Sequence, residues 1–310
     1  MSNTEFENRV YGCVVVKAIN ANYNADFNGL PRRLKSDGSF YATDKSFKWL
    51  VRNYIKKNHE SEKVLFTKQL NENFEAIDLD KAFDKLEQKA NVLFTLLECI
   101  DVRLFGATFA AKGKQLSLHG VVQVTHATDL YGKGKVYTDE ILAPFTAIGS
   151  MSKATEAHYI HNFSINPKNL SSWKNVIKKE KSLLDDGKEN SLKLLSQNDI
   201  NILKNAFNNA ATFYDSHSKS GVENELSIYV TLKENSILTL PNFAQFVKFT
   251  KGENGDKNSF DLSNLISYLS KENIAKEIVS IDIYVIDELT NVIYDNQNSI
   301  IHKFDLSQIL

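Results

Sequence analysis

The first clear pattern in the chain is an apolar run near its amino end. Residues 10–19 are β-branched or apolar at almost every position, which is typical of a strand covered on both faces. We therefore predict a central strand there. Further strands are predicted from apolar or alternating patterns at residues 120–126, 156–165, 225–232, 243–249 and 279–286.

Helical periodicity is present in three places. Apolar residues recur at three- and four-residue steps from Phe47 to Ile55, after Thr43, which is a suitable N-cap. A longer apolar stripe predicts a helix over residues 78–99, and a charged helix is expected before it over residues 61–77. Another helix is predicted from Ser196 to residue 214, because Ser196 and Asp199 resemble a capping box with Asp in place of Glu or Gln.

The order of these elements indicates the fold class. Strand, helix, strand, strand, helix, strand is the ferredoxin-like pattern, which is the scaffold of RNA-recognition modules. We predict an α+β fold, with a modified RNA-recognition-motif core in a single elaborated domain over residues 1–310. Long insertions are expected at residues 127–155, as a hairpin, and at residues 167–196, as a helical segment. The paired stacking aromatics of the RNA-recognition-motif signature are absent from the sequence, so RNA would bind on another surface.

The composition fits a chain with a large core. Of its 310 residues, 42% are hydrophobic, and no apolar run is long enough to span a bilayer. Residues 1–8 are polar and do not resemble a signal peptide, so we expect a cytoplasmic protein. Cys13 and Cys99 are expected to be buried free thiols, because no Cys-x-x-Cys or Cys/His pairing accompanies them. No cofactor is predicted.

Basic residues gather in one part of a chain that is almost neutral overall. Between residues 31 and 58, eight Lys or Arg residues stand against two acids, whereas the whole chain has a net charge of -1. Lys45, Lys48 and Arg52 form a stripe on the polar face of the predicted helix, with Trp49 on its flank. A polyanion is a natural partner for such a stripe. The alternative is a helix face whose lysines are simply solvated.

Polar residues elsewhere favour nucleic acid over a merely solvated helix. A loop after the first strand is rich in asparagine and ends in two arginines, and residues 131–135 indicate the basic tip of a hairpin. After the long helix, Arg103 would contact a phosphate or pair with Asp101, and Phe105 would stack on a base or fill the core. The residues of these stretches that would contact RNA are Asn20, Asn22, Asn24, Arg32, Arg33, Lys45, Ser46, Lys48, Trp49, Arg52, Lys133 and Lys135.

No catalytic arrangement is recognisable in the sequence. We find no nucleophile with its base, no paired carboxylates and no metal-ligand spacing. His158 and His161 lie three apart in a predicted strand and hence on opposite faces, so joint metal ligation is not expected. We predict no catalytic residue and no metal site.

Three stretches have the order and spacing of one known family. They are NANYNAD, GLPR, TDK and RNY within residues 20–54, DVRLFGATF at 101–109, and HYIHNFSINP at 158–167. Together they resemble the CRISPR Cascade backbone subunit, the Cas-seven-type family of the RAMP superfamily. The resemblance is strongest to its type I-B (Csh-two) branch and covers most of the chain.

The resemblance implies a function and a set of partners. The chain would bind CRISPR guide RNA without catalysis and irrespective of its sequence, as the repeating backbone subunit of a type I surveillance complex in antiviral defence. Its partners would be the guide RNA, target DNA paired with that guide, further copies of itself in a helical filament, and Cas-five-type and Cas-eight-type subunits, with no membrane partner. Residues 127–155 would form the thumb, a hairpin that reaches over the guide RNA, with Met151 as a wedge. The resemblance thus adds Arg103, Phe105, Gly106, Met151 and Lys153 to the predicted RNA-contacting residues.

The resemblance also leaves an alternative open. In type III relatives, an aspartate in the loop after the first strand cleaves RNA, so Asp26 would make this chain a metal-dependent endoribonuclease. A loop-capping or RNA-positioning role for Asp26 is the other interpretation.

Overall fold

The strand predicted near the amino end lies at the centre of the main sheet. The computed structural model describes residues 5–87, 92–111, 113–142, 148–170, 194–295 and 299–308. Strand β1 (Val10–Ala21) is buried over its first seven residues and pairs antiparallel with β8 (Ile148–Ile165) on one side and β9 (Val222–Leu232) on the other. Its near-continuous apolar sequence is explained by this burial on both faces.

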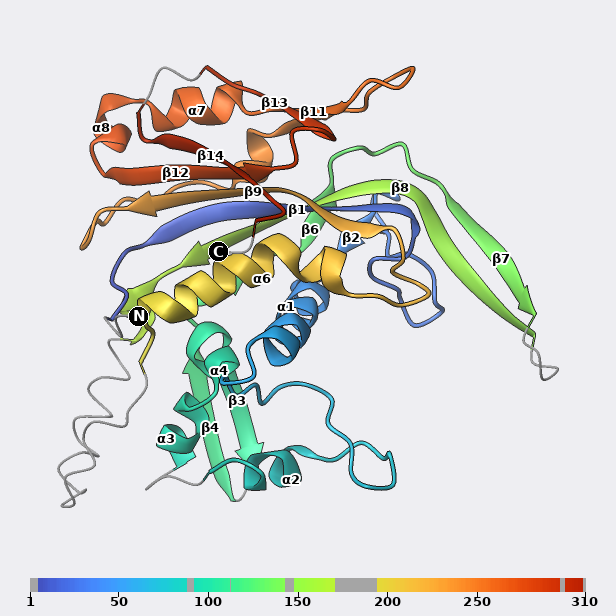
Figure 1. The fold of residues 1–310 in the computed structure, drawn as a ribbon, viewed down its shortest axis with the longest axis vertical. Coiled ribbons are helices and arrows are strands. Elements are labelled where there is room, and N and C mark those ends of the chain that lie inside the picture. Colours follow the sequence, from blue (N-terminus) through green and yellow to red (C-terminus); the bar gives the residue numbers. More distant parts are fainter. Residues whose placement is uncertain are drawn as a thin grey trace.

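Nine described strands form this sheet, which runs through the middle of Figure 1 in the order β14-β12-β9-β1-β8-β6-β2, with β5 and β7 also paired to β8. The strands not yet defined are β2 (Tyr41–Ala42), β5 (Val122–Val124), β6 (Ala127–Asp129), β7 (Val136–Leu142), β12 (Ile278–Val285) and β14 (Ile301–Asp305). The β12–β14 pair is parallel and the other pairs are antiparallel. The prediction of an α+β fold built on a large sheet is confirmed.

Two helices cover one face of the sheet, α1 (Asp44–Asn58) and α6 (Gln197–Phe213) (Figure 1). Both begin as predicted, because Thr43 accepts a hydrogen bond from the backbone of α1, and Ser196 and Asp199 form a complete capping box on α6. Phe207 on α6 contacts Phe47 on α1 and Phe163 on β8, with ring centroids 5.0 and 5.1 Å apart. These rings belong to the largest core cluster and fix both helices on the sheet.

The carboxyl-terminal part covers the opposite face with a second core. It contains the 3-10 turn η3 (Phe243–Gln245), β10 (Lys248–Thr250), β11 (Asn258–Asp261), α7 (Ser263–Leu269), α8 (Glu272–Ala275) and β13 (Thr290–Ile293). The strand predicted over residues 243–249 is therefore wrong in its first half, where the chain forms η3 and only then β10.

The two histidines of β8 lie on opposite faces of the sheet, as predicted. His161 stacks on Phe47 of α1, whereas His158 stacks on Phe249 of β10, with ring centroids 4.9 and 3.9 Å apart. The His158 ring also contacts the carboxylates of Glu225, at 2.6 Å, and Glu156, at 3.2 Å. Burial lowers the pKa of His158, but these two carboxylates outweigh burial and raise the pKa above its ordinary value.

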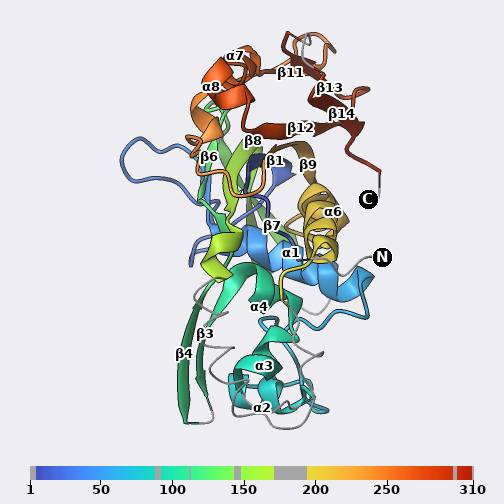
Figure 2. The same ribbon diagram turned by 90° about the vertical axis from the view of Figure 1, so that its left-hand side faces the viewer.

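An insertion between α1 and β5 forms a smaller unit below the sheet in Figures 1 and 2. It contains α2 (Leu79–Asp84), α3 (Val92–Leu97), α4 (Ile100–Phe105), β3 (Gly106–Ala111) and β4 (Lys114–His119). Its separate core includes Phe83 and Phe109, whose ring centroids lie 4.9 Å apart.

Two helix predictions in this insertion are wrong. Residues 61–77 form turns and isolated bridges, and the long helix predicted over 78–99 is interrupted after Asp84, with a further helix, α3, in the later part. The apolar stripe that suggested one helix instead supplies several short elements that pack with the β3–β4 ribbon. Tertiary packing has overridden the local pattern.

Two excursions leave the main sheet on either side of β8. Strand β7 pairs with residues 148–154 of β8, and the β7–β8 hairpin projects beyond the sheet on the right of Figure 1. After β8, the chain forms the 3-10 turn η1 (Pro167–Leu170); most of the helical segment predicted over 167–196 lies outside the described residues. No helix in the described ranges is long and apolar enough to cross a membrane.

Candidate nucleic-acid interface

The loop after β1 is held by its own asparagines. Asn20, the penultimate residue of β1, has a left-handed backbone (φ 49°), and both Asn20 and its neighbour Ile19 are exposed, so the buried run of the strand ends before them. Asn22 is buried and donates from Nδ2 to the carbonyls of Gly29 and Ser152, each at 3.0 Å. Asn24 accepts from the backbone and hydroxyl of Thr43 at 2.9 and 3.0 Å. The amides of Asn22 and Asn24 therefore join the loop to β8 and to α1.

Beneath this loop, Tyr23 anchors it to the sheet. Its hydroxyl donates to Nε2 of His161 at 2.9 Å, while Nδ1 of His161 donates to the Thr125 carbonyl at 2.9 Å. Burial lowers the pKa of His161 to about 4, so the ring is neutral and this pairing is retained at neutral pH. The anchor is a buried one and carries no charge toward a ligand.

Lys219, which is not among the predicted residues, also holds this loop. Its ammonium group donates to the Tyr23 carbonyl at 2.6 Å and lies 5.9 Å from the Tyr23 ring. Burial lowers the pKa of Lys219 to about 8. It comes from the loop between α6 and β9, about 200 positions away along the chain, so only the folded structure brings the two together.

The start of α1 lies beside the same loop. Ser46 donates to the Tyr23 carbonyl at 3.4 Å, and Lys45 is exposed. Lys48 instead pairs with Asp44 at 3.0 Å, and Arg52 pairs with Asp101 at 3.1 Å. The predicted basic stripe is therefore present, but two of its charges are partly neutralised within the protein.

Two aromatic side chains, Trp49 and Phe105, flank the basic stripe. Trp49 is 37% exposed and packs edge-to-face on Tyr214, with ring centroids 4.7 Å apart. Phe105 is half-buried beside the stripe, and its ring lies 5.0 Å from the Arg52 guanidinium and 5.7 Å from the Lys48 ammonium. Trp49 and Phe105 thus place two aromatic rings beside the basic stripe.

The β7–β8 hairpin meets the loop from the other side. The Tyr137 hydroxyl donates to Oδ1 of Asn20 at 3.3 Å, and Tyr137 lies opposite Lys153 in the hairpin. Met151 and Lys153 alternate with the buried Ser152, so both lie on the hairpin face turned away from the core. Both are half-buried.

The segment before β7 brings more cations to the loop. Lys133 and Lys135 are exposed, and the backbone of Lys135 bonds to Thr155 of β8. Arg33 donates to the Gly134 carbonyl at 3.4 Å and lies over the Phe40 ring at 4.3 Å. The basic segment predicted as a hairpin tip, residues 131–135, therefore lies beside Arg33 and precedes the β7–β8 hairpin.

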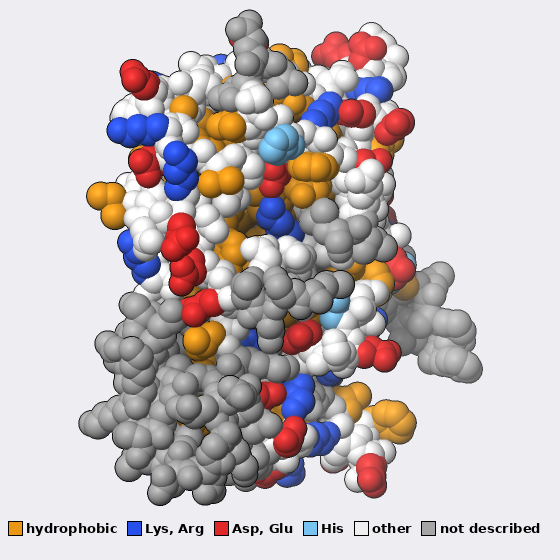
Figure 3. Space-filling view, turned by 60° about the vertical axis from the view of Figure 1, so that its left-hand side comes forward, with side chains coloured by type: hydrophobic (Ala, Val, Ile, Leu, Met, Phe, Trp, Pro, Cys, Tyr) orange, Lys and Arg blue, Asp and Glu red, His pale blue; other side chains and the backbone are white. Residues whose placement is uncertain are grey.

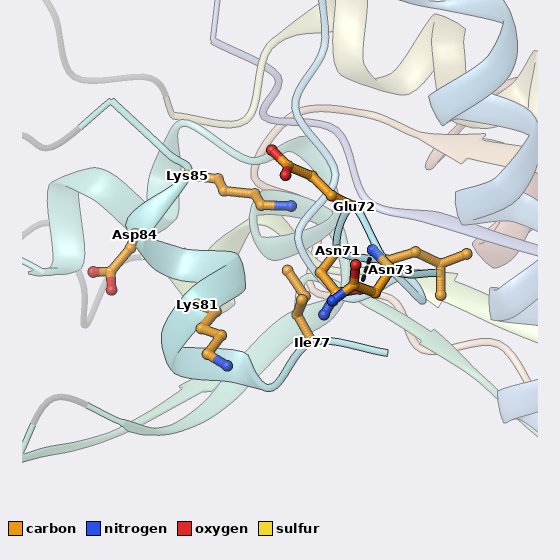
Figure 4. A pocket seen from close by; sticks show the side chains of 8 residues that line it. Asn71, Glu72, Asn73, Ile77, Lys81, Asp84 and Lys85 are labelled. Atoms are coloured by element: carbon orange, nitrogen blue, oxygen red, sulfur yellow. Dashed lines mark hydrogen bonds between the residues drawn. The ribbon is translucent and has the colours of Figure 1, made fainter. Parts of the chain in front are cut away.

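Two other surfaces differ from this one. On the face in Figure 3, basic and acidic side chains are interspersed among apolar ones. A pocket of about 670 Å³ in the insertion has side chains of both signs, as Figure 4 shows for Lys81, Lys85, Glu72 and Asp84. None of the predicted RNA-contacting residues lines that pocket.

Comparison with known proteins decides the family. The chain matches the family model described as CRISPR-associated protein Cas7 over residues 8–287. The chain belongs to the Cas7 family. No curated protein sequence matches it significantly.

Two solved structures are similar to this chain. A chain of a "CRISPR RNA-guided surveillance complex, pre-nicking" has a TM-score of 0.51 and 12% sequence identity, and the match covers 96% of each chain. A chain of a second "CRISPR RNA-guided surveillance complex" has a TM-score of 0.49 and 12% identity, with 96% of this chain and 94% of that chain covered. The first of these likenesses shows a common fold.

In this Cas7 protein, Arg103 and Gly106 lie in the interior, which corrects the prediction that they contact RNA. Arg103 is 2% exposed and pairs with Asp199 and Glu62, at 2.7 and 2.9 Å, rather than with Asp101. Gly106 is buried with φ 73°, and a Cβ there would lie 2.1 Å from the Leu118 carbonyl oxygen. Arg103 thus joins the insertion to α6, and Gly106 allows β4 to approach closely.

Asp26 caps its own loop in this Cas7 protein. Its Oδ1 accepts hydrogen bonds from the backbone of Asn28 at 2.8 Å and of Leu30 at 2.9 Å. This is the Asx-type bonding that the loop-capping interpretation requires. Across the described ranges, no three His, Cys, Asp or Glu side chains are grouped to hold a metal ion.

Proposed function

We propose that this chain is the repeating backbone subunit of a CRISPR RNA-guided surveillance complex and binds the guide RNA without cleaving it. Family membership supports the role. The basic loop and helix support the ligand, because cationic side chains that contact phosphates position a strand without reading its sequence. The bases would stay available for pairing with target DNA.

The proposed surface has two parts. The first comprises the loop after β1, the start of α1 and the segment before β7, with Arg32, Arg33, Lys45, Lys133 and Lys135 as phosphate contacts and Asn20, Ser46, Trp49 and Phe105 beside them. The second is the outer face of the β7–β8 hairpin, with Met151 and Lys153. In this proposal the hairpin is the thumb, and it crosses onto the RNA held by the next copy.

Finer assignments belong to the same proposal. Strands β9, β1, β8 and β6 lie side by side in antiparallel order with α1 and α6 on one face, which supports a ferredoxin-like core in one elaborated domain. We assign the chain to the type I-B branch, with Cas-five-type and Cas-eight-type partners. Contact between copies is head-to-tail, so it gives an open helical filament along the RNA.

The observation that carries the proposal is that hydrogen bonds from the loop after β1 reach both α1 and β8, so the predicted cations gather around one loop. The protein, purified at low salt, is expected to carry RNA, and its affinity is expected to fall steeply with salt. For the five cations of one copy, Arg32, Arg33, Lys45, Lys133 and Lys135, the slope of log affinity against log salt is expected to be about −3.5, at about −0.7 for each contact with single-stranded RNA.

Charge reversal provides the test. Lys45→Glu is expected to weaken binding equally for RNAs of different sequence, whereas Lys81→Glu, in the pocket of the insertion, is the matched control and is expected to have little effect. Purified protein free of nucleic acid, with no salt-dependent RNA binding, would contradict the proposal.

A further inference from the structure

The most exposed aromatic side chain of the described chain is at the tip of the loop after β1. Phe27 is 102% exposed, so its ring has almost no contact with the rest of the protein. Exposure alone is common among single apolar side chains, so the surroundings of this ring decide whether it has a role.

The loop that presents Phe27 is closed by several hydrogen bonds. Besides the two that Asp26 accepts on its side chain, the Asp26 amide donates to the Leu30 carbonyl at 2.8 Å, and the Gly29 amide donates to the Asp26 carbonyl at 3.2 Å. Gly29 has φ 80°, which favours glycine. The turn therefore holds the backbone of Phe27 at its apex, so a partner has only the side chain to order.

Planar side chains continue from Phe27 toward α1. The Arg32 guanidinium lies 6.0 Å from the centre of the Phe27 ring and donates to the Tyr41 hydroxyl at 3.4 Å. The Tyr41 ring stacks on His126, with centroids 6.2 Å apart and planes inclined by 20°. His126 is itself exposed and lies 3.3 Å from Asp44 at the start of α1. An aromatic ring, a guanidinium and two further rings thus form a path that ends at the basic helix.

This combination suits a nucleobase better than an apolar protein surface. Single-stranded nucleic acid is bound by a basic groove that tracks the backbone and by aromatic or guanidinium planes on which bases stack. Here Arg32 provides both a plane and a charge, and Arg33 adds another charge. An apolar pocket on another protein would gain little from these two cations at its rim.

We propose that Phe27 is a base-stacking residue, on which one nucleobase of the bound RNA rests beside Arg32. The inference depends on the proposed function, because it assigns Phe27 to the same RNA surface. Every base offers a π face, so such a contact is compatible with sequence-independent binding.

The experiment compares two oligonucleotides of equal length, one with bases and one made of abasic sugar-phosphate units. Binding of each to the full chain is measured by fluorescence anisotropy. Phe27→Ala is expected to weaken binding of the base-bearing strand by about 5- to 150-fold and to leave binding of the abasic strand unchanged. Phe27→Trp is expected to restore binding, whereas Phe27→Leu, which keeps only apolar volume, is not.

Phe74 provides a matched control, because its ring is 84% exposed on a different loop. Phe74→Ala is expected to bind both strands like the parent. Equal losses on both strands with Phe27→Ala, full affinity with Phe27→Leu, or an effect confined to self-association without RNA would overturn the inference.

Lys45→Glu separates this inference from the proposed function. If Lys45→Glu weakens binding of both strands while Phe27→Ala weakens neither, only the stacking role is wrong. If the parent binds neither strand, the proposed function is wrong as well.

Discussion

Arg103→Ala is expected to lower the free energy of unfolding by about 3–5 kcal/mol. The guanidinium donates five hydrogen bonds: to both carboxylate oxygens of Asp199, to Glu62, and to the carbonyls of Leu97 and Glu98, at distances between 2.7 and 3.1 Å. Removing it leaves the Asp199 carboxylate buried without its cation. The expected loss is a large part of the about 5–15 kcal/mol that stabilises a typical protein.

Urea unfolding followed by circular dichroism measures this effect, and anisotropy with labelled RNA is measured in parallel at low urea. Arg103→Ala is expected to shift the unfolding midpoint and to bind RNA like the parent while it remains folded. Lys45→Ala is the matched control and is expected to do the reverse, since Lys45 is exposed. An Arg103→Ala variant with parental stability and weakened RNA binding would refute this reasoning.

A second variant separates the buried charge from the lost packing. Arg103→Met with Asp199→Asn removes both charges but keeps a side-chain oxygen at position 199 for the Ser196 backbone, which Asp199 binds at 3.0 Å. This pair is expected to be more stable than Arg103→Met alone. Equal stability would show that the buried charge of Asp199 costs little when unpaired.

Three further predictions follow from the structure. The pKa of His158 is raised in the folded protein, so the protonated ring stabilises the fold fully below about pH 6.5, and this stabilisation is lost as pH rises through the raised pKa. In urea unfolding, the stability difference between the parent and His158→Gln is therefore expected to be larger at about pH 6 than at about pH 9. Asp26→Ala is expected to cost about 1 kcal/mol through its lost loop hydrogen bonds and to leave RNA intact, as in the parent, when magnesium is added; ion-dependent cleavage by the parent that is lost in the variant would instead support the endoribonuclease. Lys153→Glu is expected to retain binding to an oligonucleotide that fits one copy and to lose cooperative binding to one that fits several, because Lys153 lies on the outer face of the hairpin. Equal loss of affinity for both lengths would show that Lys153 contacts the RNA bound by its own copy.

The parts of the fold that the sequence predicted are those in which local pattern and tertiary environment agree. Strand β1 is apolar because both faces of its sheet are covered, and α1 and α6 have apolar stripes that face one core between recognisable caps. The insertion breaks this agreement. Its stripe over residues 78–99 resembles a single helix, but the residues pack against a small ribbon whose existence the local pattern does not reveal.

The candidate interface was predictable as a region rather than as a set of contacts. Residue types indicated a polar basic loop before a basic helix, and the structure places both together. Internal ion pairs were not predictable, because the acidic partners lie far along the chain: Arg52 pairs with Asp101, and Arg103 pairs with Asp199. Lys219 and His126 reach the loop only through the fold. Phe27 had a local signal, as an aromatic residue at the tip of a polar loop beside two arginines.

Internal pairing changes how a nearly neutral chain holds a polyanion. Burial alone would raise the pKa of Asp44, but the hydrogen bond and charge of Lys48 outweigh burial and lower the pKa below its ordinary value. Asp44 therefore stays ionised and reduces the charge that Lys48 can offer to RNA. The basic stripe therefore contributes mainly through Lys45, and other cations come from the loop, the segment before β7 and the hairpin. In the proposed function, Lys153 of the hairpin contacts the strand held by the next copy, so part of the charge that neutralises the RNA comes from a neighbouring subunit.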